Sequence, residues 1–161
     1  MMERASTMRA PEGALLADLV LSALARQRDL YLEMLGVVQE HERRLAAGDE
    51  DSLEGLVQRR QRLLGQVESV ERTLAPLRGD WDARVEAWGP QVRARLDVVL
   101  AGLKDVLARL IAAEDRFARA LAIRRAGVGA QIRRVAVGAQ ARAAYQVPGV
   151  SEDHHAVDRS R

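Results

Sequence analysis

Apolar residues recur at steps of three and four along most of this chain, which is the spacing of one face of an α-helix. The first run covers residues 11–47, where Pro11 suits a first helical turn because proline lacks an N–H group that would stay unused there. Its apolar positions are Leu16, Val20, Leu24, Tyr31, Leu35, Val38 and Leu45. A second run covers residues 50–76, with Leu53, Leu56, Val57, Leu63, Leu64, Val67, Val70 and Leu74. Because mostly polar residues fill the other positions of the second run, we expect long helices that pack on other helices.

The corner between these two helices is acidic, with Asp49, Glu50, Asp51 and Glu54. A calcium loop of the EF-hand type that began at Asp49 would need glycine at its sixth position and glutamate at its twelfth. The chain has Glu54 and Arg60 at these positions, so we exclude this kind of site. Gly48 instead suits the end of the first helix, and Asp49 suits the N-cap of the second, where it would contribute about 1 kcal/mol to stability.

A third run begins at Pro90 and can extend to residue 146, with Gly127, Gly129 and Gly138 as points where the helix could break. Its apolar positions include Val92, Leu96, Val99, Leu103, Val106, Leu110, Phe117, Leu121, Val128, Ile132, Val135 and Ala139. Residues 80–89 hold both tryptophans in a short helix that either closes the end of a bundle or binds a ligand or partner. We therefore expect an all-α chain in which a long antiparallel helical hairpin packs with a third long helix in a coiled-coil-like bundle. This single domain would cover residues 11–146, with disordered ends at 1–10 and 147–161.

The three expected helices differ in length. At about 1.5 Å per residue, the first is near 55 Å long, the second about 40 Å, and an unbroken third about 85 Å. In an antiparallel bundle the first two helices can cover the third only to about Leu121. The apolar stripe formed by Leu121, Val128, Ile132, Val135 and Ala139 would then lie largely exposed, and an exposed apolar stripe of this size usually marks a partner site.

The residue types limit the possible chemistry. The chain has no cysteine, which excludes disulfides, thiolate metal sites and a cysteine nucleophile. His41 lies between Glu40 and Glu42, but residues adjacent in sequence on a helix do not face each other. His154 and His155 lie in the expected disordered tail, and there is no glycine-rich phosphate loop. We therefore expect no enzyme activity, no bound metal and no cofactor.

The distribution of arginines and of apolar stretches along the chain indicates which class of partner it binds and where in the cell it lies. Residues 116–150 contain seven arginines and no acidic residue, interspersed with Ala, Val, Gly and Ile. A nucleic-acid interface would more readily add Lys, Ser and Asn, so we expect a protein partner rather than nucleic acid. The apolar stretch at residues 13–25 contains Asp18, which argues against a signal peptide, and no apolar run approaches the roughly 20 residues of a membrane span. We therefore expect a cytoplasmic protein that does not insert into a membrane.

Residues 31–72, "YLEMLGVVQEHERRLAAGDEDSLEGLVQRRQRLLGQVESVER", resemble the FlgN-type flagellar export chaperones. In that family a first helix ends in L-x-x-G-D, and the second has regularly spaced leucines, a basic residue and a late glutamate. The matching positions are Leu45, Gly48, Asp49, Leu53, Leu56, Arg60, Leu63, Leu64, Val67, Val70 and Glu71. A late Y-x-x-x-G of the family matches Tyr145 and Gly149, so the resemblance covers about residues 15–149. The chain departs at residues 112–121, "AAEDRFARAL", where the family often has asparagines.

This resemblance implies a cytoplasmic chaperone of the flagellar type III secretion system. Such chaperones bind the C-terminal helices of hook-filament junction proteins, prevent premature assembly and deliver these clients to the export gate. The client would bind the stripe at Leu121, Val128, Ile132, Val135 and Ala139, and Tyr145 would dock on an export-gate component. The alternative is a self-associating coiled-coil structural or adaptor protein, in which the same stripe pairs with a second copy in a homodimer.

Overall fold

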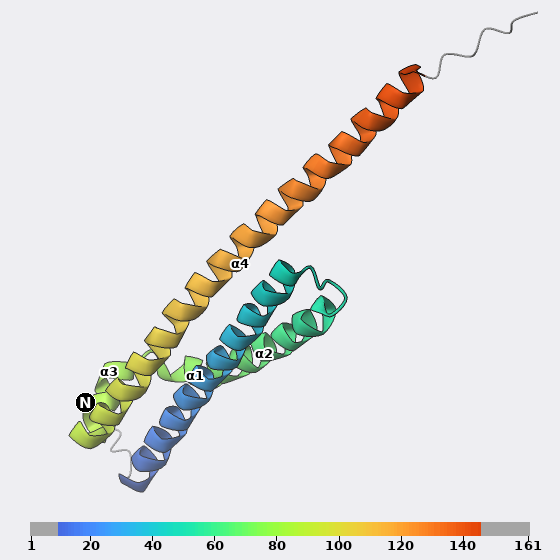
Figure 1. The fold of residues 1–161 in the computed structure, drawn as a ribbon. Helices are drawn as coiled ribbons and strands as arrows, with labels where there is room; N and C mark the ends of the chain where they lie inside the picture. Colours follow the sequence, from blue (N-terminus) through green and yellow to red (C-terminus); the bar gives the residue numbers. More distant parts are fainter. Residues whose placement is uncertain (1–9, 146–161) are drawn as a thin grey trace, which may run out of the picture. The chain divides into compact units, whose positions relative to one another are not determined.

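The computed structural model describes residues 10–145, and their side chains from 12 to 143. The helices in this range are α1 (Ala10–Ala47), α2 (Leu53–Leu74), the 3₁₀ turn η1 (Ala75–Leu77), α3 (Trp81–Trp88) and α4 (Pro90–Tyr145) (Figure 1). The described residues contain no strand, and the expectation of an all-α fold of long helices is confirmed. α4 is a single helix that passes through Gly127, Gly129 and Gly138, so none of these glycines breaks it. The expected disordered ends lie outside the described residues apart from Ala10, and so do His154 and His155.

The chain divides into two compact units, residues 1–121 and residues 122–161. The first unit, which we call the bundle, contains α1, α2, α3 and α4 as far as Leu121. The second contains the rest of α4, and we call its described part, residues 122–145, the C-terminal helix segment.

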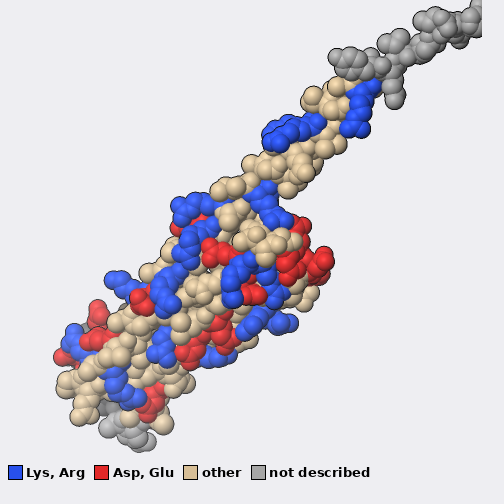
Figure 2. All heavy atoms as spheres, viewed as in Figure 1, with Lys and Arg blue, Asp and Glu red and all other residues tan. Residues whose placement is uncertain are grey.

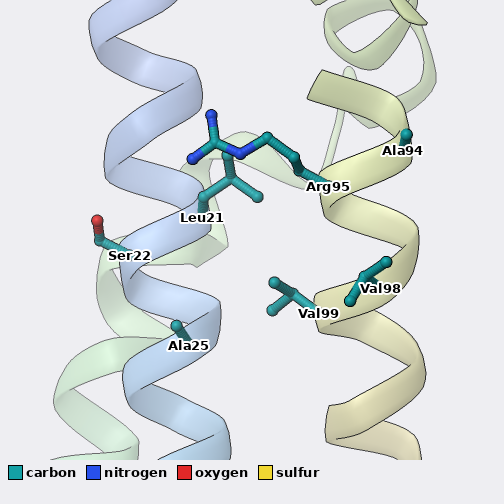
Figure 3. Close-up of a pocket in the computed structure, with 7 residues that line it drawn as sticks. All are labelled: Leu21, Ser22, Ala25, Ala94, Arg95, Val98 and Val99. Carbon is teal, nitrogen blue, oxygen red and sulfur yellow. The ribbon is translucent and has the colours of Figure 1, made fainter. Parts of the chain in front are cut away.

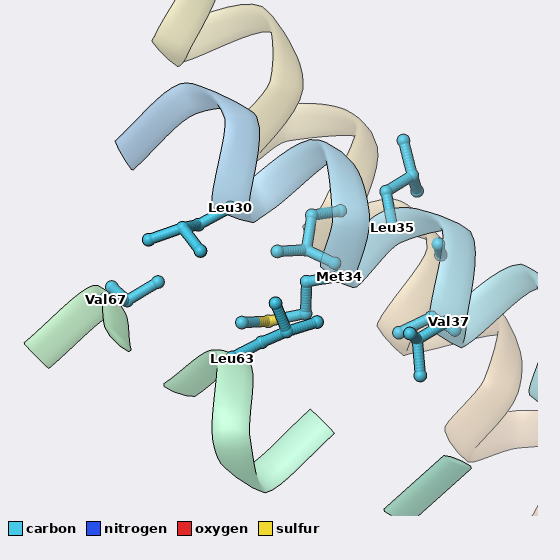
Figure 4. Packing of buried hydrophobic residues seen from close by; sticks show 9 residues of the cluster. Leu30, Met34, Leu35, Val37, Leu63 and Val67 are labelled. Atoms are coloured by element: carbon cyan, nitrogen blue, oxygen red, sulfur yellow. The ribbon is translucent and has the colours of Figure 1, made fainter. Parts of the chain in front are cut away.

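The bundle is held together by two clusters of buried apolar side chains. The first joins three helices through Leu30, Met34, Leu35, Val37 and Val38 of α1, Leu63 and Val67 of α2, and Leu110 and Ala113 of α4. Figure 4 shows Leu30 and Met34 pointing from α1 toward Val67 and Leu63. The second cluster contains Val20, Leu21 and Leu24 of α1, Leu74 of α2 and Leu96 of α4. α1 therefore supplies most of the buried side chains of the two clusters.

The two tryptophans of α3 pack against the second cluster. Their rings meet edge to face, with centroids 6.1 Å apart and an angle of 90° between the ring planes. This arrangement agrees with a short helix that closes one end of the bundle.

His41 is a core residue of the bundle. It is buried, and its ring stacks on Phe117 of α4 with centroids 5.2 Å apart and an interplanar angle of 12°. Its Nε2 atom lies 3.4 Å from the carbonyl oxygen of Leu53. Next to this stack, Arg116 Nε lies 3.3 Å from Glu42 Oε1, which adds a second link between α4 and α1. The role of His41 in this structure is packing between helices.

The first half of the corner between α1 and α2 is built as expected. Gly48 has φ of +74°, in the left-handed region that glycine adopts without a steric penalty. The N–H of Gly48 donates to the carbonyl of Leu45 at 3.2 Å, and that of Asp49 donates to the carbonyl of Arg44 at 3.0 Å. These two bonds satisfy carbonyl groups at the end of α1 in the Schellman pattern. Glu40 accepts a hydrogen bond from Arg44, which holds the pKa of Glu40 below its ordinary value.

The second half of the corner corrects the expectation for Asp49. α2 begins at Leu53 rather than at residue 50, and its N-cap is Ser52. Ser52 makes no side-chain capping bond; its hydroxyl donates to Asp49 Oδ2 at 2.9 Å. Asp49 lies in the corner before α2, and its carboxylate accepts from the Ser52 hydroxyl rather than from a backbone N–H of α2. Asp49 therefore stabilises the turn from an exposed position through its bond to Ser52. Removing its carboxylate should lower the stability by less than the removal of an N-cap side chain would.

The core predicts a strong contrast between two leucines of α1. Leu30→Ala removes a side chain that is 0% exposed, so it should lower the free energy of unfolding by about 2–5 kcal/mol. The matched control Leu32→Ala, at a position 41% exposed on the same helix, should lower it by less than about 1 kcal/mol. Urea unfolding followed by tryptophan fluorescence measures this, because Trp81 and Trp88 both lie in the bundle. Equal losses from the two variants would contradict the assigned core.

The corner predicts opposite effects at two glycines. Gly48→Ala forces a side chain into the left-handed region and should cost about 1 kcal/mol or more. Gly55→Ala adds a methyl group within helix α2 with no atom within 4 Å, so it should raise stability by about 0.5–1 kcal/mol. The same unfolding measurement compares them, and a neutral Gly48→Ala would mean that the corner has another conformation.

Candidate partner-binding helix face

The C-terminal helix segment contains no buried side chain among its described residues 122–143. Five large apolar side chains are strongly exposed there: Ile123 (74%), Val128 (49%), Ile132 (63%), Val135 (68%) and Val137 (64%). Of the positions predicted to bind a client, Val128, Ile132, Val135 and Ala139 are therefore all exposed. Leu121 differs, because it is half-buried and is the last residue of the bundle unit. The side chain of Tyr145, the last helical residue, lies outside the described part.

One face of the segment has the spacing of a coiled-coil seam. Arg125, Val128, Ile132, Val135, Ala139 and Arg142 follow one another at alternating steps of three and four residues. We call these six residues the seam. Positions of this kind lie along one line of an α-helix that faces a partner helix. The seam is thus apolar over its four inner positions and basic at both ends.

The positions beside the seam decide how closely a partner helix can approach. On one side they are Ala122, Gly129, Ala136 and Ala143, and on the other they are Arg124, Gln131 and Gly138. The first side carries no side chain larger than a methyl group. Small flanking residues leave room for a second helix to lie against the backbone. The seam can therefore accept large apolar side chains from a partner.

The segment is basic throughout. Residues 122–143 contain five arginines and no acidic residue. Figure 2 shows this part of the chain with blue and tan atoms and no red ones on the visible face. The side chains of Arg125 and Arg142 are exposed, and neither forms an ion pair with another described side chain. Both can therefore meet a negatively charged partner.

Sequence reasoning missed two features of this segment. Ile123 and Val137 lie on the side opposite the seam, because nine residues turn a helix by two and a half turns. Arg125 and Arg142 occupy seam positions, although they interrupt the apolar pattern. A strict count of alternating three- and four-residue steps would have found the arginines, whereas a search for apolar residues alone passes over them.

The bundle has a groove of about 550 Å³ between α1 and the start of α4. It is lined by Leu21, Ser22, Ala25, Ala94, Arg95, Val98 and Val99 (Figure 3). Arg95 reaches across from α4, and its Nη1 lies 3.7 Å from Asp18 Oδ1. The lining is mostly apolar, and it brings together no pair of groups suited to acid–base chemistry.

The described residues also bear on two other kinds of site, a metal site and a membrane-spanning helix. No three or more His, Asp or Glu side chains within this part of the chain are placed to hold a metal ion. Among the helices between residues 10 and 145, none is long and apolar enough to cross a membrane. Comparisons of the chain with models of protein families, with curated proteins and with solved structures gave no match.

The exposed seam predicts low local stability in the C-terminal helix segment. Without buried side chains, its helix depends mainly on local hydrogen bonds, and each helical glycine weakens it by about 1 kcal/mol relative to alanine. The amides of residues 122–143 should therefore exchange with deuterium much faster than those of the buried part of α1. Replacing Gly127, Gly129 and Gly138 by Ala, with no atom within 4 Å of any added methyl group, should slow their exchange about tenfold or more. Hydrogen exchange with mass spectrometry tests this, and wild-type protection equal to that of the bundle core would contradict it.

Proposed function

We propose that this chain is a chaperone that binds an amphipathic helix of a client protein along the seam of its C-terminal helix segment. The observation that carries the proposal is the exposure of Val128, Ile132 and Val135 on one face of a regular helix. Fully burying a side chain of this size contributes about 1.5–3 kcal/mol, so covering the three together gives a partner helix a substantial driving force. A helix laid on an apolar helical face is a common mode of peptide recognition.

The nature of the client comes from the family resemblance. The L-x-x-G-D sequence at the end of α1, which includes Gly48, and the spacing of the leucines in α2 support assignment to the FlgN-type flagellar export chaperones. On this assignment the clients are the C-terminal helices of hook-filament junction proteins. The chaperone covers these helices in the cytoplasm, prevents premature assembly and delivers them to the export gate, where Tyr145 docks. This function requires no catalytic group, metal or cofactor.

The proposal predicts that two substitutions in the seam abolish client binding. Ile132→Asp together with Val135→Asp places two charges where the client's apolar side chains would lie, which costs several kcal/mol when the charges are buried. Co-purification of a hook-filament junction protein with the full chain should be lost. The fold should be retained, because both side chains are exposed.

The chain provides a matched control on the same helix. Ile123→Asp with Val137→Asp changes two equally exposed side chains on the opposite side of the segment, and it should leave co-purification intact. Circular dichroism of both variants checks that helix content is unchanged. If the seam variant binds the junction protein as well as the parent chain does, the assigned site is wrong.

The alternative function is self-association through the same seam, which its coiled-coil spacing favours. Sedimentation measured over a range of concentrations separates the two functions. A dimer that survives dilution supports the structural or adaptor protein, whereas a monomer that binds a client supports the chaperone.

A further inference from the structure

The seam carries a charge at each end, and these charges limit what can pair with it. Arg125 precedes the apolar positions and Arg142 follows them, both on the line that faces a partner helix. The two are 17 positions apart, which corresponds to about 25 Å along the helix axis. Both side chains are exposed in the segment taken by itself.

A second copy of this chain matches the seam poorly in either direction. In a parallel pair aligned in register, Arg125 faces the Arg125 of the other copy, and Arg142 faces the other Arg142. In an antiparallel pair that places Ile132 opposite Val135, Arg125 faces Arg142 at both ends. Like charges placed opposite each other destabilise a helix pair, and no acidic residue between 122 and 143 offsets them. Both pairings that align the whole apolar seam therefore oppose a homodimer.

We infer that the seam selects an amphipathic helix whose apolar stripe is bracketed by acidic residues about 17 positions apart. Such a helix places a carboxylate against Arg125 and another against Arg142 while its apolar side chains cover Val128, Ile132 and Val135. Because both ends of the seam carry the same charge, this partner fits in either direction. The inference rests on the proposed use of the seam as a helix-binding site and adds the chemistry of the partner.

The chain itself supplies a probe with this chemistry. The double variant Arg125→Glu with Arg142→Glu keeps the apolar seam and carries an acidic residue at each end. Mixed with the wild-type chain, it places Glu against Arg at both ends in the parallel and in the antiparallel pairing. We expect a one-to-one heterodimer with at least about tenfold higher affinity than either chain shows for itself.

The experiment uses full-length chains, one with an affinity tag and one without, and measures pairing by capture and by sedimentation at about 50 mM and about 500 mM salt. The preference for the mixed pair should shrink at the higher salt, because exposed charges are screened within a shorter distance there. As a matched control, Arg133→Glu with Arg134→Glu changes the same number of charges on the same segment away from the seam. This control should pair with the wild type less well than the seam variant does.

The outcomes separate this inference from the proposed function. A wild-type dimer as tight as the mixed pair, or equal pairing by the Arg133 and Arg134 control, overturns the selection of an acidic partner. The absence of any mixed pair at low salt also overturns it. If a junction protein still co-purifies through Ile132 and Val135 in these cases, the helix-binding function stands and only the partner's charge is wrong. If neither the mixed pair nor the junction protein binds, both fail.

Discussion

The fold depends on the packing of α1 against both other long helices. Val20, Leu30 and Val38 of α1 are almost fully buried, and they belong to the two clusters that contain the buried side chains of α2 and α4. α4 has 56 residues and is longer than α1, which has 38. Within the described part, the buried side chains of α4 all lie between Leu96 and Ala113, so the rest of this helix has none. The same three- and four-residue repeat that buries α4 in the bundle therefore continues along the sequence into residues whose apolar side chains are exposed.

The sequence predicts the helices well because their signals are local and repeated. The apolar spacing of α1 and α2 repeats over many turns, so a single exception does not hide it. Glycine is the residue type that most readily adopts the left-handed backbone conformation with which a helix ends, and Gly48 stands at that position. The prediction that Asp49 caps α2 was wrong for a physical reason. Asp, Ser and Asn types can all serve as N-caps, and both Asp49 and Ser52 precede an apolar run, so composition does not decide between them. The Schellman bonds at the end of α1 place Asp49 in the turn, and the helix begins three residues later than a cap at Asp49 would give.

The continuity of α4 through Gly127 and Gly129 was left open by the sequence, since each glycine lowers helix propensity without forbidding a helix. Four of the five positions predicted to bind a client are exposed, and their role in binding stays a prediction. Leu121 is half-buried because it belongs to the bundle unit, a boundary that apolar spacing does not mark. Arg125 and Arg142 lie on the same line of the helix as the apolar seam residues, but apolar spacing alone does not mark them because they are charged.

An exposed apolar seam poses a problem for any protein that must remain available to a client, because the best partner for such a seam is often another copy of it. More apolar residues would strengthen client binding and self-association together. Charges at the two ends separate these outcomes, since a like-charged copy is repelled at both ends and an acid-bracketed helix is attracted at both. Placing the arginines in the seam rather than beside it makes this discrimination stronger, because a partner cannot cover the apolar positions without also meeting Arg125 and Arg142. The glycines within the segment also favour a matching partner. They lower the intrinsic stability of the helix, so the segment gains order mainly when such a partner covers it.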